Sequence, residues 1–493
     1  MSAPGGFTLG YGFAVGGGAG ASRRRTINVA FLGDSVTEAI SVETYGSDGY
    51  PNVSYKYGGY GNWLFMLTGG RVMFDYEDNF GVSGDRSDQI LTRAEACAAR
   101  PVEVMLIHAG HNDITQLGPF YGNDVNLLRS TLLDNIAAMV AAARDAGVRP
   151  VISAIWGHRN WASSFQTEAY DGHMLDIRAW CLANSVKFID EHLPEIVDPE
   201  TNCISEAMSA DGVHPNALGA YVFAKPIARW LTGLLQSPSH CDRVTGDRTA
   251  DYLNPLDGTG GTVSSPYTGQ LADDLISLGG ATITQGTVTF SKHARPEGGW
   301  EQRMTWAGVI GTNPAGEAFH GFRVRLETPD VDPYEKFMAV CRARFTSESS
   351  GLWCPSIQIY EYNGNGSAGP RTGRLRAGSE WPAELNGAEV TLRSPPMVMR
   401  PGTNGDVEIR IGGLVLETAG ITGELAVWDL ELLRVPGPPP PEPPDPIDVP
   451  WNLDADYDGT GSAAVEWTIQ NDYGAATYDL VATTRIPGAY TLT

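Results

Sequence analysis

Lysine is scarce in this chain of 493 residues, and only five of its 34 basic residues are lysine. Acidic residues outnumber the basic ones, 58 to 34. The resulting formal charge of −24 repels phosphate backbones and anionic lipid surfaces, so neither a nucleic acid nor a membrane is expected as the main partner. The sequence contains no run of about 18 apolar residues, which argues against a membrane-spanning helix. Hydrophobic residues still make up 42% of the chain, so large cores are possible, and the length predicts roughly two to four domains.

Cysteine motifs are missing as well. The six cysteines include no C-x-x-C pair, and no zinc, redox or cofactor motif is visible, so no metal and no cofactor are expected. Cys97 and Cys181 lie in helix-like stretches and are expected to be buried as small hydrophobic side chains. Cys341 and Cys354 flank a predicted turn, and they either pair across neighbouring strands or remain free.

Residues 1–25 form a Gly-rich leader that does not match a secretory signal, since its basic cluster follows the apolar part instead of preceding it. The leader is either a floppy tail or a segment that packs against a larger assembly.

Residues 26–238 alternate short β-branched runs with helix-like segments, which is typical of βαβ units and predicts a parallel sheet with helices on both faces. Ligands of such sheets bind beyond the carboxyl ends of the strands. The expected strands are 27–32, 71–74, 102–107, 151–155 and 186–189, and the expected helices lie near 86–99, 123–146, 165–184 and 216–236.

The pattern changes near residue 240. Residues 239–435 show strand alternation and turn dipeptides, which predict an all-β sandwich that is either a carbohydrate-binding module or a structural part of the preceding domain. A Pro-rich linker follows at 436–450, and residues 451–493 form a small β module that is too short for a comfortable core of its own.

Four short blocks in residues 26–238 carry chemistry. Ser35 follows the first predicted strand in the sequence Gly-Asp-Ser, and Gly84 follows the second strand. Asn112 lies after the third strand, and Asp211 precedes His214 by three residues before the last helix. Each block is a weak signal by itself, but together they place a hydroxyl, an open N–H, an amide and an acid–imidazole pair at one crevice.

This ordered set resembles the SGNH hydrolases, also called the GDSL esterase/lipase family. The resemblance implies a flavodoxin-like, five-stranded parallel sheet and a serine esterase of the carboxylic-ester hydrolase class. Ser35 would be the nucleophile, His214 the base and Asp211 the acid, while the N–H groups of Ser35 and Gly84 and the side chain of Asn112 would form the oxyanion hole. The chain lacks a Gly-x-Ser-x-Gly elbow, which argues against an α/β-hydrolase.

Four further residues are hypothesised to contact substrate. His111 departs from the family pattern, where a small or hydroxyl residue is more common, and Trp156 and His158 follow the fourth strand on the ligand side. Tyr60 belongs to a Tyr-rich insertion after the nucleophile block. Aromatic faces near an esterase site suit sugar rings, but they can equally pack the insertion.

These additions favour removal of O-acetyl groups from a polysaccharide, with a general short-chain esterase or thioesterase as the alternative. The leader, hydrolase, β modules and Pro-rich spacer together resemble a phage tail fibre or spike. That resemblance implies a virion or extracellular location, contact with other virion tail proteins through the leader, and a homotrimer. A binding protein of the virion or of adhesion, with an accessory esterase domain, is the remaining alternative.

Overall fold

The computed structural model describes residues 26–45, 51–161, 163–234, 242–243, 258–279, 283–296, 298–311, 317–326, 336–347, 352–362, 367–368, 371–372, 382–399, 406–416, 421–435, 465–471 and 474–480. The predicted leader (1–25) and Pro-rich linker (436–450) lie outside these residues. The chain divides into two compact units, residues 1–438 and 439–493.

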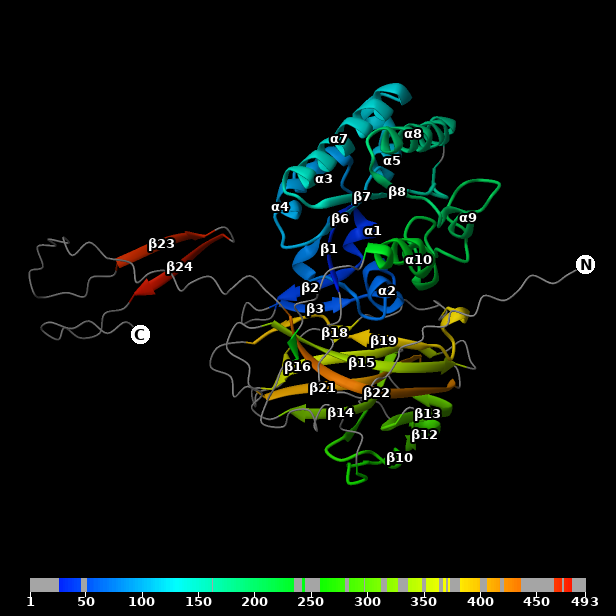
Figure 1. Ribbon diagram of the computed structural model, residues 1–493, viewed down its shortest axis with the longest axis vertical. Coiled ribbons are helices and arrows are strands. Elements are labelled where there is room, and N and C mark those ends of the chain that lie inside the picture. The colour runs from blue at the N-terminus through cyan, green and yellow to red at the C-terminus, as the bar shows by residue number, and fades with distance from the viewer. Residues whose placement is uncertain are drawn as a thin grey trace, which may run out of the picture. The chain divides into compact units, whose positions relative to one another are not determined.

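The first part of the larger unit is a three-layer α/β structure (Figure 1). Its strands are β1 (Ile27–Gly33), β4 (Val72–Met73), β5 (Asn79–Gly81), β6 (Val104–His108), β7 (Arg149–Ser153) and β8 (Lys187–Ile189). Its helices are α1 (Ser35–Glu38), α2 (Tyr60–Leu67), α3 (Ser87–Leu91), α4 (Ala94–Ala98), α5 (His111–Thr115), α6 (Leu117–Tyr121), α7 (Val125–Asp145), α8 (Ser164–Ala183), α9 (Leu193–Ile196) and α10 (Ala217–Leu234), with the 3-10 turn η1 (Tyr76–Asp78).

All strand pairs of this sheet are parallel, in the order β4-β1-β6-β7-β8, and β5 also pairs with β1. Strand β1 therefore lies between β4 and β6, the next two strands of this path along the chain. This is the flavodoxin-like strand order 2-1-3-4-5. The predicted fold class is confirmed, and each expected strand of residues 26–238 has its counterpart. A parallel sheet collects the loops after β1, β5 and β6 at one edge.

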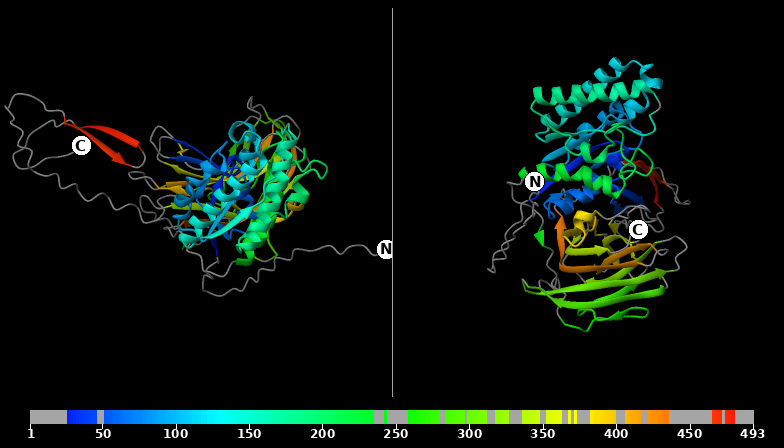
Figure 2. Two further views of the ribbon diagram at one scale, coloured as in Figure 1. Left: turned by 90° about the horizontal axis from the view of Figure 1, so that it is seen from above. Right: turned by 90° about the vertical axis from the view of Figure 1, so that its right-hand side faces the viewer.

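Alternation along each strand decides which helices cover which face. On β1, Ala30 and Leu32 pack with α7 and α8, whereas Val29 and Phe31 pack with α2 and α10. All four side chains are buried. Figures 1 and 2 show the same order of layers, with α7 and α8 on one side of the sheet and α2 and α10 on the other.

Helix α7 illustrates how local sequence sets an element. Asp124 caps its N-terminus by accepting a hydrogen bond from the N–H of Leu127 at 3.0 Å. Apolar side chains then recur at helical spacing, and the buried ones are Val125, Leu128, Leu132, Ile136, Met139, Val140 and Ala143.

The rest of the larger unit is a β-sandwich of two eight-stranded sheets. The first sheet contains β9 (Asp242–Arg243), β10 (Thr268–Gly269), β12 (Ile283–Ala294), β13 (Trp300–Gly311), β15 (Lys336–Ser347), β19 (Glu389–Arg393), β20 (Met397–Val398) and β22 (Ile421–Val435). The second contains β2 (Ser41–Tyr45), β3 (Pro51–Tyr55), β11 (Ile276–Gly279), β14 (Glu317–Leu326), β16 (Leu352–Tyr362), β17 (Ser367–Ala368), β18 (Arg371–Thr372) and β21 (Asp406–Leu416). The turn η2 (Ala383–Leu385) precedes β19.

Two strands of the second sheet come from the α/β part of the chain. The hairpin β2–β3 follows the nucleophile block, and β3 pairs in parallel with β18. The sequence pattern does not show this, because the hairpin's partner strand lies more than 300 residues further along the chain. The Tyr-rich insertion therefore links the α/β part to the sandwich, and Tyr55, Tyr57 and Tyr60 are fully buried there.

Polar contacts reinforce this junction. The hydroxyl of Tyr57 donates to the carbonyl of Pro355 at 2.8 Å, and Lys336 lies 2.5 Å from the carboxylate of Asp75. Arg393 is fully buried, and its guanidinium lies 3.9 Å from the centroid of the Phe74 ring. One apolar cluster runs from β1, α2 and α10 into both sheets of the sandwich, so the two parts share a core.

The positions of the cysteines decide whether Cys341 and Cys354 pair across neighbouring strands or remain free. Cys97, Cys181, Cys203 and Cys341 are free thiols, and all but Cys203 are buried. Cys341 lies on β15 of the first sheet, whereas Cys354 lies on β16 of the second, so these residues do not form the neighbouring-strand pair.

The smaller unit contains the antiparallel hairpin of β23 (Val465–Asn471) and β24 (Gly474–Leu480), in which Trp467 lies opposite Tyr478. Among the described helices of the chain, none combines the length and the apolar character that crossing a membrane requires.

We expect a chain that ends at residue 238 to aggregate or to lose cooperative unfolding, because the cut exposes the apolar cluster shared with the sandwich. A chain that ends at Pro438 keeps the whole larger unit and should retain the melting temperature of the full chain. Size-exclusion chromatography and thermal unfolding followed by circular dichroism measure both outcomes. A soluble, monomeric fragment of residues 26–238 with a sharp melting transition would contradict the shared core.

Candidate active site

Ser35 begins α1 directly after β1, at the carboxyl edge of the parallel sheet. Asp34 caps this short helix by accepting a hydrogen bond from the N–H of Val36 at 3.0 Å. Gly33 precedes them where an added Cβ would meet the Thr37 side chain at 2.2 Å and the His108 carbonyl at 2.6 Å. The tight turn therefore needs glycine, and it leaves the half-buried Ser35 open to solvent.

His214 joins the nucleophile block to the last block of the sequence. Its Nε2 lies 2.8 Å from Ser35 Oγ, and its Nδ1 lies 2.9 Å from Asp211 Oδ2. Asp211 Oδ1 accepts the backbone N–H groups of Val213 and His214 at 2.9 and 2.8 Å. Burial opposes ionisation of Asp211, but these hydrogen bonds outweigh it and lower the pKa of the carboxyl below its usual value. Asp211 is thus a carboxylate that holds the ring with its Nε2 toward the serine.

Three hydrogen-bond donors predicted for an oxyanion hole come from three separate loops. Ser35 is the first residue of α1, so its N–H has no acceptor within the helix. Gly84 has a φ of +83°, and an added Cβ there would meet nothing within 4 Å, so backbone conformation rather than space requires the glycine. Asn112 uses one amide hydrogen to bind the carbonyl of Asp85 at 3.0 Å, which ties its side chain to the Gly84 loop.

Buried polar contacts fix these loops, and the sequence analysis missed their partners. Asp113 accepts both the N–H and the hydroxyl of Ser87, at 2.8 and 2.6 Å, and so clamps α5 to the loop that carries Gly84. Ser209 donates to Asp211 Oδ1 at 3.1 Å and accepts the N–H of Gly212 at 2.9 Å. In the sequence, the signal for the first clamp is an Asp directly after Asn112, and the structure shows that this Asp is buried.

The four residues hypothesised to contact substrate are all buried, so the structure corrects that hypothesis. His111, Trp156, His158 and Tyr60 are exposed by 2, 0, 4 and 0%. They pack with one another and with neighbouring rings beneath the site, His111 lying 4.9 Å from Trp156 and 4.8 Å from His158 between ring centroids. The sequence placed them on the correct side of the sheet, but large aromatic surfaces gain more from burial than from exposure to solvent.

Trp156 has a supporting position instead. Its indole N–H donates to the carbonyl of Val213 at 3.0 Å, and Val213 is the residue directly before His214. The backbone N–H of Trp156 donates to His111 Nε2 at 3.2 Å. This ring therefore connects the loop of the base to the helix of the oxyanion-hole amide.

One cluster among the described residues has a composition that could hold a metal ion, namely Asp34, His108 and His111. Their ligand atoms lie within 4.8 Å of one another, and all three residues are buried. In the described part of the chain, Asp34 Oδ2, His108 Nε2 and His111 Nδ1 have no hydrogen-bond partner.

Hydrogen bonds on the far side of each ring fix the tautomers in this cluster. Ser153 Oγ donates to the carbonyl of Ile107 and therefore accepts from His108 Nδ1, which leaves a lone pair on His108 Nε2. His111 Nε2 accepts the N–H of Trp156, so Nδ1 carries the hydrogen and faces Asp34 Oδ2 at 3.6 Å. The set offers an ion only one carboxylate oxygen and one ring nitrogen, which is too few for a structural zinc site.

The charge state of Asp34 follows from the same surroundings. Burial raises the pKa of its carboxyl above the ordinary value. A protonated carboxyl can face the lone pair of His108 Nε2 without repulsion, whereas a carboxylate cannot. The cluster therefore fits a neutral polar network beneath Ser35 better than a metal site.

Two polar side chains lie beside the loop that carries Asp211 and His214. Arg159 and Asn160 are exposed, and Asn160 donates to the carbonyl of Asp211 at 3.4 Å. Beyond the Gly84 loop lie the exposed Val82 and Phe120, and the Arg86 guanidinium covers the Phe120 ring at 3.6 Å. This surface offers hydrogen bonds on the acid side of the site and one aromatic ring on the oxyanion side.

The segment Asp190-Glu191-His192 follows β8, and its side chains form no acid–base pair with one another. Asp190 pairs with Arg178 at 2.7 Å and Glu191 with Lys187 at 3.1 Å. His192 is buried, and its Nε2 lies 3.2 Å from the carbonyl of Ala154.

Residues 31–222 match a family model described as the GDSL-like Lipase/Acylhydrolase family. The match covers less than half of the chain and includes every residue of the predicted catalytic set, Ser35, Gly84, Asn112, Asp211 and His214. This segment is therefore a GDSL-like acylhydrolase domain. No curated protein matches the sequence.

Several solved structures are similar to this part of the chain. A GDSL-like lipase from Bacteroides thetaiotaomicron is 18% identical, with 42% of this chain and 89% of that chain covered and a TM-score of 0.32. A catalytic mutant of an acetylxylan esterase from Geobacillus stearothermophilus is 15% identical, with 42% and 96% covered and a TM-score of 0.32. A member of the lipolytic G-D-S-L family from Veillonella parvula is 18% identical, with 41% and 96% covered and a TM-score of 0.30.

Lowering the pH should destabilise this protein already at pH values well above those at which carboxylates titrate. Burial lowers the pKa to about 3 or about 4 for five histidines of the hydrolase part, which are His108, His111, His158, His173 and His192. Below an unfolded pKa of about 6.5, the unfolded chain binds protons that the folded chain does not. The free energy of unfolding therefore decreases as the pH is lowered. Each ring contributes up to about 1.4 kcal/mol per pH unit in this window.

Urea unfolding at a series of pH values between about 7 and about 5 measures this slope. Burial raises the pKa of Asp34, Asp78 and Asp113, and these carboxyls oppose the loss of stability at lower pH. They are three groups against five histidines. A His173→Gln variant removes one of these rings, so the slope of the free energy of unfolding against pH should decrease by the contribution of one proton. His173 is chosen because it lies outside the nucleophile–base pair. A free energy of unfolding that is constant across this range would contradict the neutral, buried state of these rings.

Proposed function

We propose that this protein is a serine ester hydrolase that removes O-acetyl groups from a polysaccharide. The observation that carries the proposal is the unbroken hydrogen-bonded chain from Ser35 Oγ through the His214 ring to Asp211 Oδ2, with distances of 2.8 and 2.9 Å. A serine hydroxyl is a weak nucleophile at its own pKa and needs such a base.

The acylation step uses this chain directly. His214 Nε2 takes the Ser35 proton as Oγ attacks the ester carbonyl, and Asp211 stabilises the imidazolium that forms. The same ring then gives the proton to the leaving sugar hydroxyl, and the acetyl group stays on Ser35. In the second half, His214 takes a proton from water as the water oxygen attacks the acyl carbon. The ring then gives this proton to Ser35 Oγ as the bond from Oγ to the acyl carbon breaks and acetic acid leaves.

The tetrahedral intermediate places negative charge on the former carbonyl oxygen. The N–H of Ser35, the N–H of Gly84 and the free amide hydrogen of Asn112 are the donors assigned to that oxygen. Loss of one such donor costs on the order of 2.7–4 kcal/mol of transition-state stabilisation. The clamp between Asp113 and Ser87 supports this role, since it holds the Asn112 helix against the Gly84 loop.

The surface near the site favours a polar alcohol and a short acyl group. Of the described exposed large hydrophobic side chains, only Val82 and Phe120 lie on segments that reach the oxyanion side, which gives no apolar trough for a long acyl chain. Arg159 and Asn160 offer hydrogen bonds of the kind that sugar hydroxyls accept. A general short-chain esterase or thioesterase would use the same catalytic residues and differ only in the alcohol or thiol that leaves.

Replacing Ser35 by alanine should lower kcat for p-nitrophenyl acetate by roughly 10⁴-fold or more, because the nucleophile is lost. The melting temperature should stay within a few degrees, since Ser35 is only half-buried. Ser130→Ala is the matched control, because Ser130 is exposed on α7 and should leave kcat unchanged. Retained turnover in Ser35→Ala would remove the nucleophile assignment.

Acetate release from acetylated xylan, acetylated pectin and acetylated bacterial capsule tests the substrate class. We expect kcat/KM for at least one acetylated glycan to exceed that for p-nitrophenyl acetate, and activity on p-nitrophenyl esters to fall as the acyl chain lengthens beyond acetate. The Ser35→Ala variant measures the background of non-enzymatic release. Equal rates on acetyl and octanoyl esters, with no release from any glycan, would favour the general esterase instead.

A further inference from the structure

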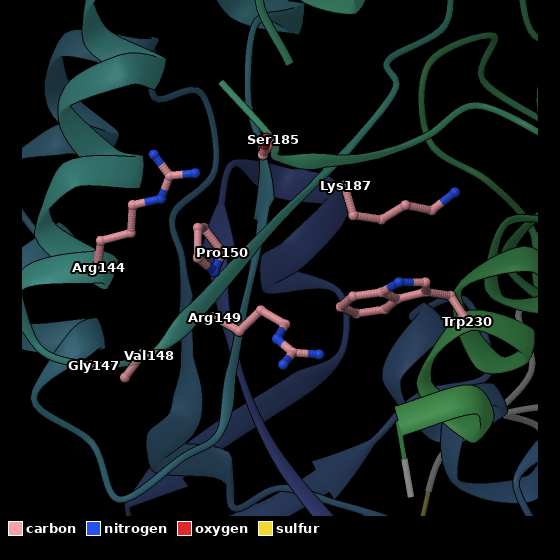
Figure 3. A pocket seen from close by; sticks show the side chains of 8 residues that line it. All are labelled: Arg144, Gly147, Val148, Arg149, Pro150, Ser185, Lys187 and Trp230. Atoms are coloured by element: carbon pink, nitrogen blue, oxygen red, sulfur yellow. The ribbon is translucent and has the colours of Figure 1, made fainter. Parts of the chain in front are cut away.

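A basic cavity lies on the far edge of the parallel sheet from Ser35. Its volume is about 490 Å³, and Figure 3 shows the residues that line it. The lining residues are Arg144, Gly147, Val148, Arg149, Pro150, Ser185, Lys187 and Trp230. Arg149 and Lys187 are the first residues of β7 and β8, so the cavity opens at the amino ends of these strands.

The cavity is therefore separate from the site that contains Ser35. Ser35 follows the carboxyl end of β1, and a strand of five residues such as β7 spans roughly 16 Å at about 3.3 Å per residue. No residue of the catalytic set contributes to the lining. A ligand in the cavity can be held without blocking access to Ser35.

Three cationic side chains line this cavity in a chain whose formal charge is −24. Within the described residues, Arg149 forms no ion pair, and its side chain is exposed. Arg144 donates to the carbonyl of Asn184 at 2.6 Å, and it has no carboxylate partner in the part of the chain that the structure describes. Lys187 alone has an acidic partner, Glu191, at 3.1 Å.

Trp230 adds an aromatic ring to these charges. Its side chain is half-buried on α10, and Figure 3 shows the indole pointing toward Arg149, with Lys187 beside it and Arg144 on α7 at the opposite side of the lining. An indole face stacks on the C–H face of a sugar ring, and a guanidinium binds a carboxylate with two parallel hydrogen bonds. The combination matches a sugar that carries a carboxylate.

We infer that this cavity binds a uronate unit of an acidic polysaccharide and holds the polymer while Ser35 acts on acetyl groups elsewhere along it. The inference rests on the proposed function and narrows its substrate to acidic glycans. The rest of the acidic surface repels such a polymer, so local cations are needed to retain it. Binding at two points raises the effective concentration of acetyl esters near Ser35 without adding any contact at the catalytic residues.

The test measures binding of polygalacturonate oligomers to the full-length Ser35→Ala protein by isothermal titration calorimetry, with dextran as the uncharged control. We expect binding of polygalacturonate and none of dextran. The substitutions Arg149→Gln and Lys187→Gln should each weaken binding about tenfold, as loss of one charge-assisted hydrogen bond predicts. Arg178→Gln removes an exposed arginine from the same domain and should leave the affinity unchanged.

Three results would overturn the inference. The first is no binding of polygalacturonate, and the second is equal weakening by Arg178→Gln. The third is binding of polyphosphate as tight as that of polygalacturonate, with the same loss in Arg149→Gln, which would indicate a general anion patch. Arg149 and Arg178 are exposed and Lys187 is half-buried, and the melting temperature of each variant checks that it folds.

Kinetics separate this inference from the proposed function. In the active protein, Arg149→Gln should raise KM for an acetylated acidic glycan and leave kcat/KM for p-nitrophenyl acetate unchanged. Unchanged KM for the glycan overturns the cavity assignment and leaves the esterase intact. Loss of p-nitrophenyl acetate hydrolysis in Ser35→Ala with full retention of polygalacturonate binding supports both conclusions independently.

Discussion

The hydrogen bond between His214 Nε2 and Ser35 Oγ is the contact on which the rest of the hydrolase part depends. It joins residues 179 positions apart, and it can form only if β1 lies inside the sheet and the loop before α10 returns to the carboxyl edge. The parallel order β4-β1-β6-β7-β8 brings the nucleophile, the Gly84 loop and the Asn112 helix to that edge. Asp211 then orients the ring from the same short loop, so base and acid move together.

Beneath this contact lies a layer of buried rings rather than a second catalytic shell of exposed groups. His108, His111 and His158 are neutral because burial lowers their pKa to about 3, and Asp34 is pushed toward its protonated form by the same burial. Neutral groups avoid the cost of buried unpaired charge, and their far ring nitrogens fix the tautomers through backbone and hydroxyl partners. This layer supports the turn around Ser35 from below. Its contribution to the free energy of unfolding depends on pH.

The sandwich is part of the same folded unit as the hydrolase. The β2–β3 hairpin extends one of its sheets, and Arg393 lies fully buried against Phe74 at the junction. A module that only tethers a polymer needs no shared core, whereas here the apolar cluster continues from α2 and α10 into both sheets. The basic cavity is on the hydrolase itself, so polymer binding does not require the sandwich to be a carbohydrate-binding module.

Periodicity and turn chemistry by themselves determined the parallel sheet, the long helices and the order of the four site blocks, because these depend on residues close in sequence. The distance of 2.8 Å between Ser35 and His214, the burial of Trp156 and His111, and the pairing of β3 with β18 were decided only by tertiary structure. An aromatic residue on the ligand side of a sheet has the same local pattern whether it meets substrate or packs below it. Its exposure depends on which distant segment covers it, and the sequence around it does not contain that information.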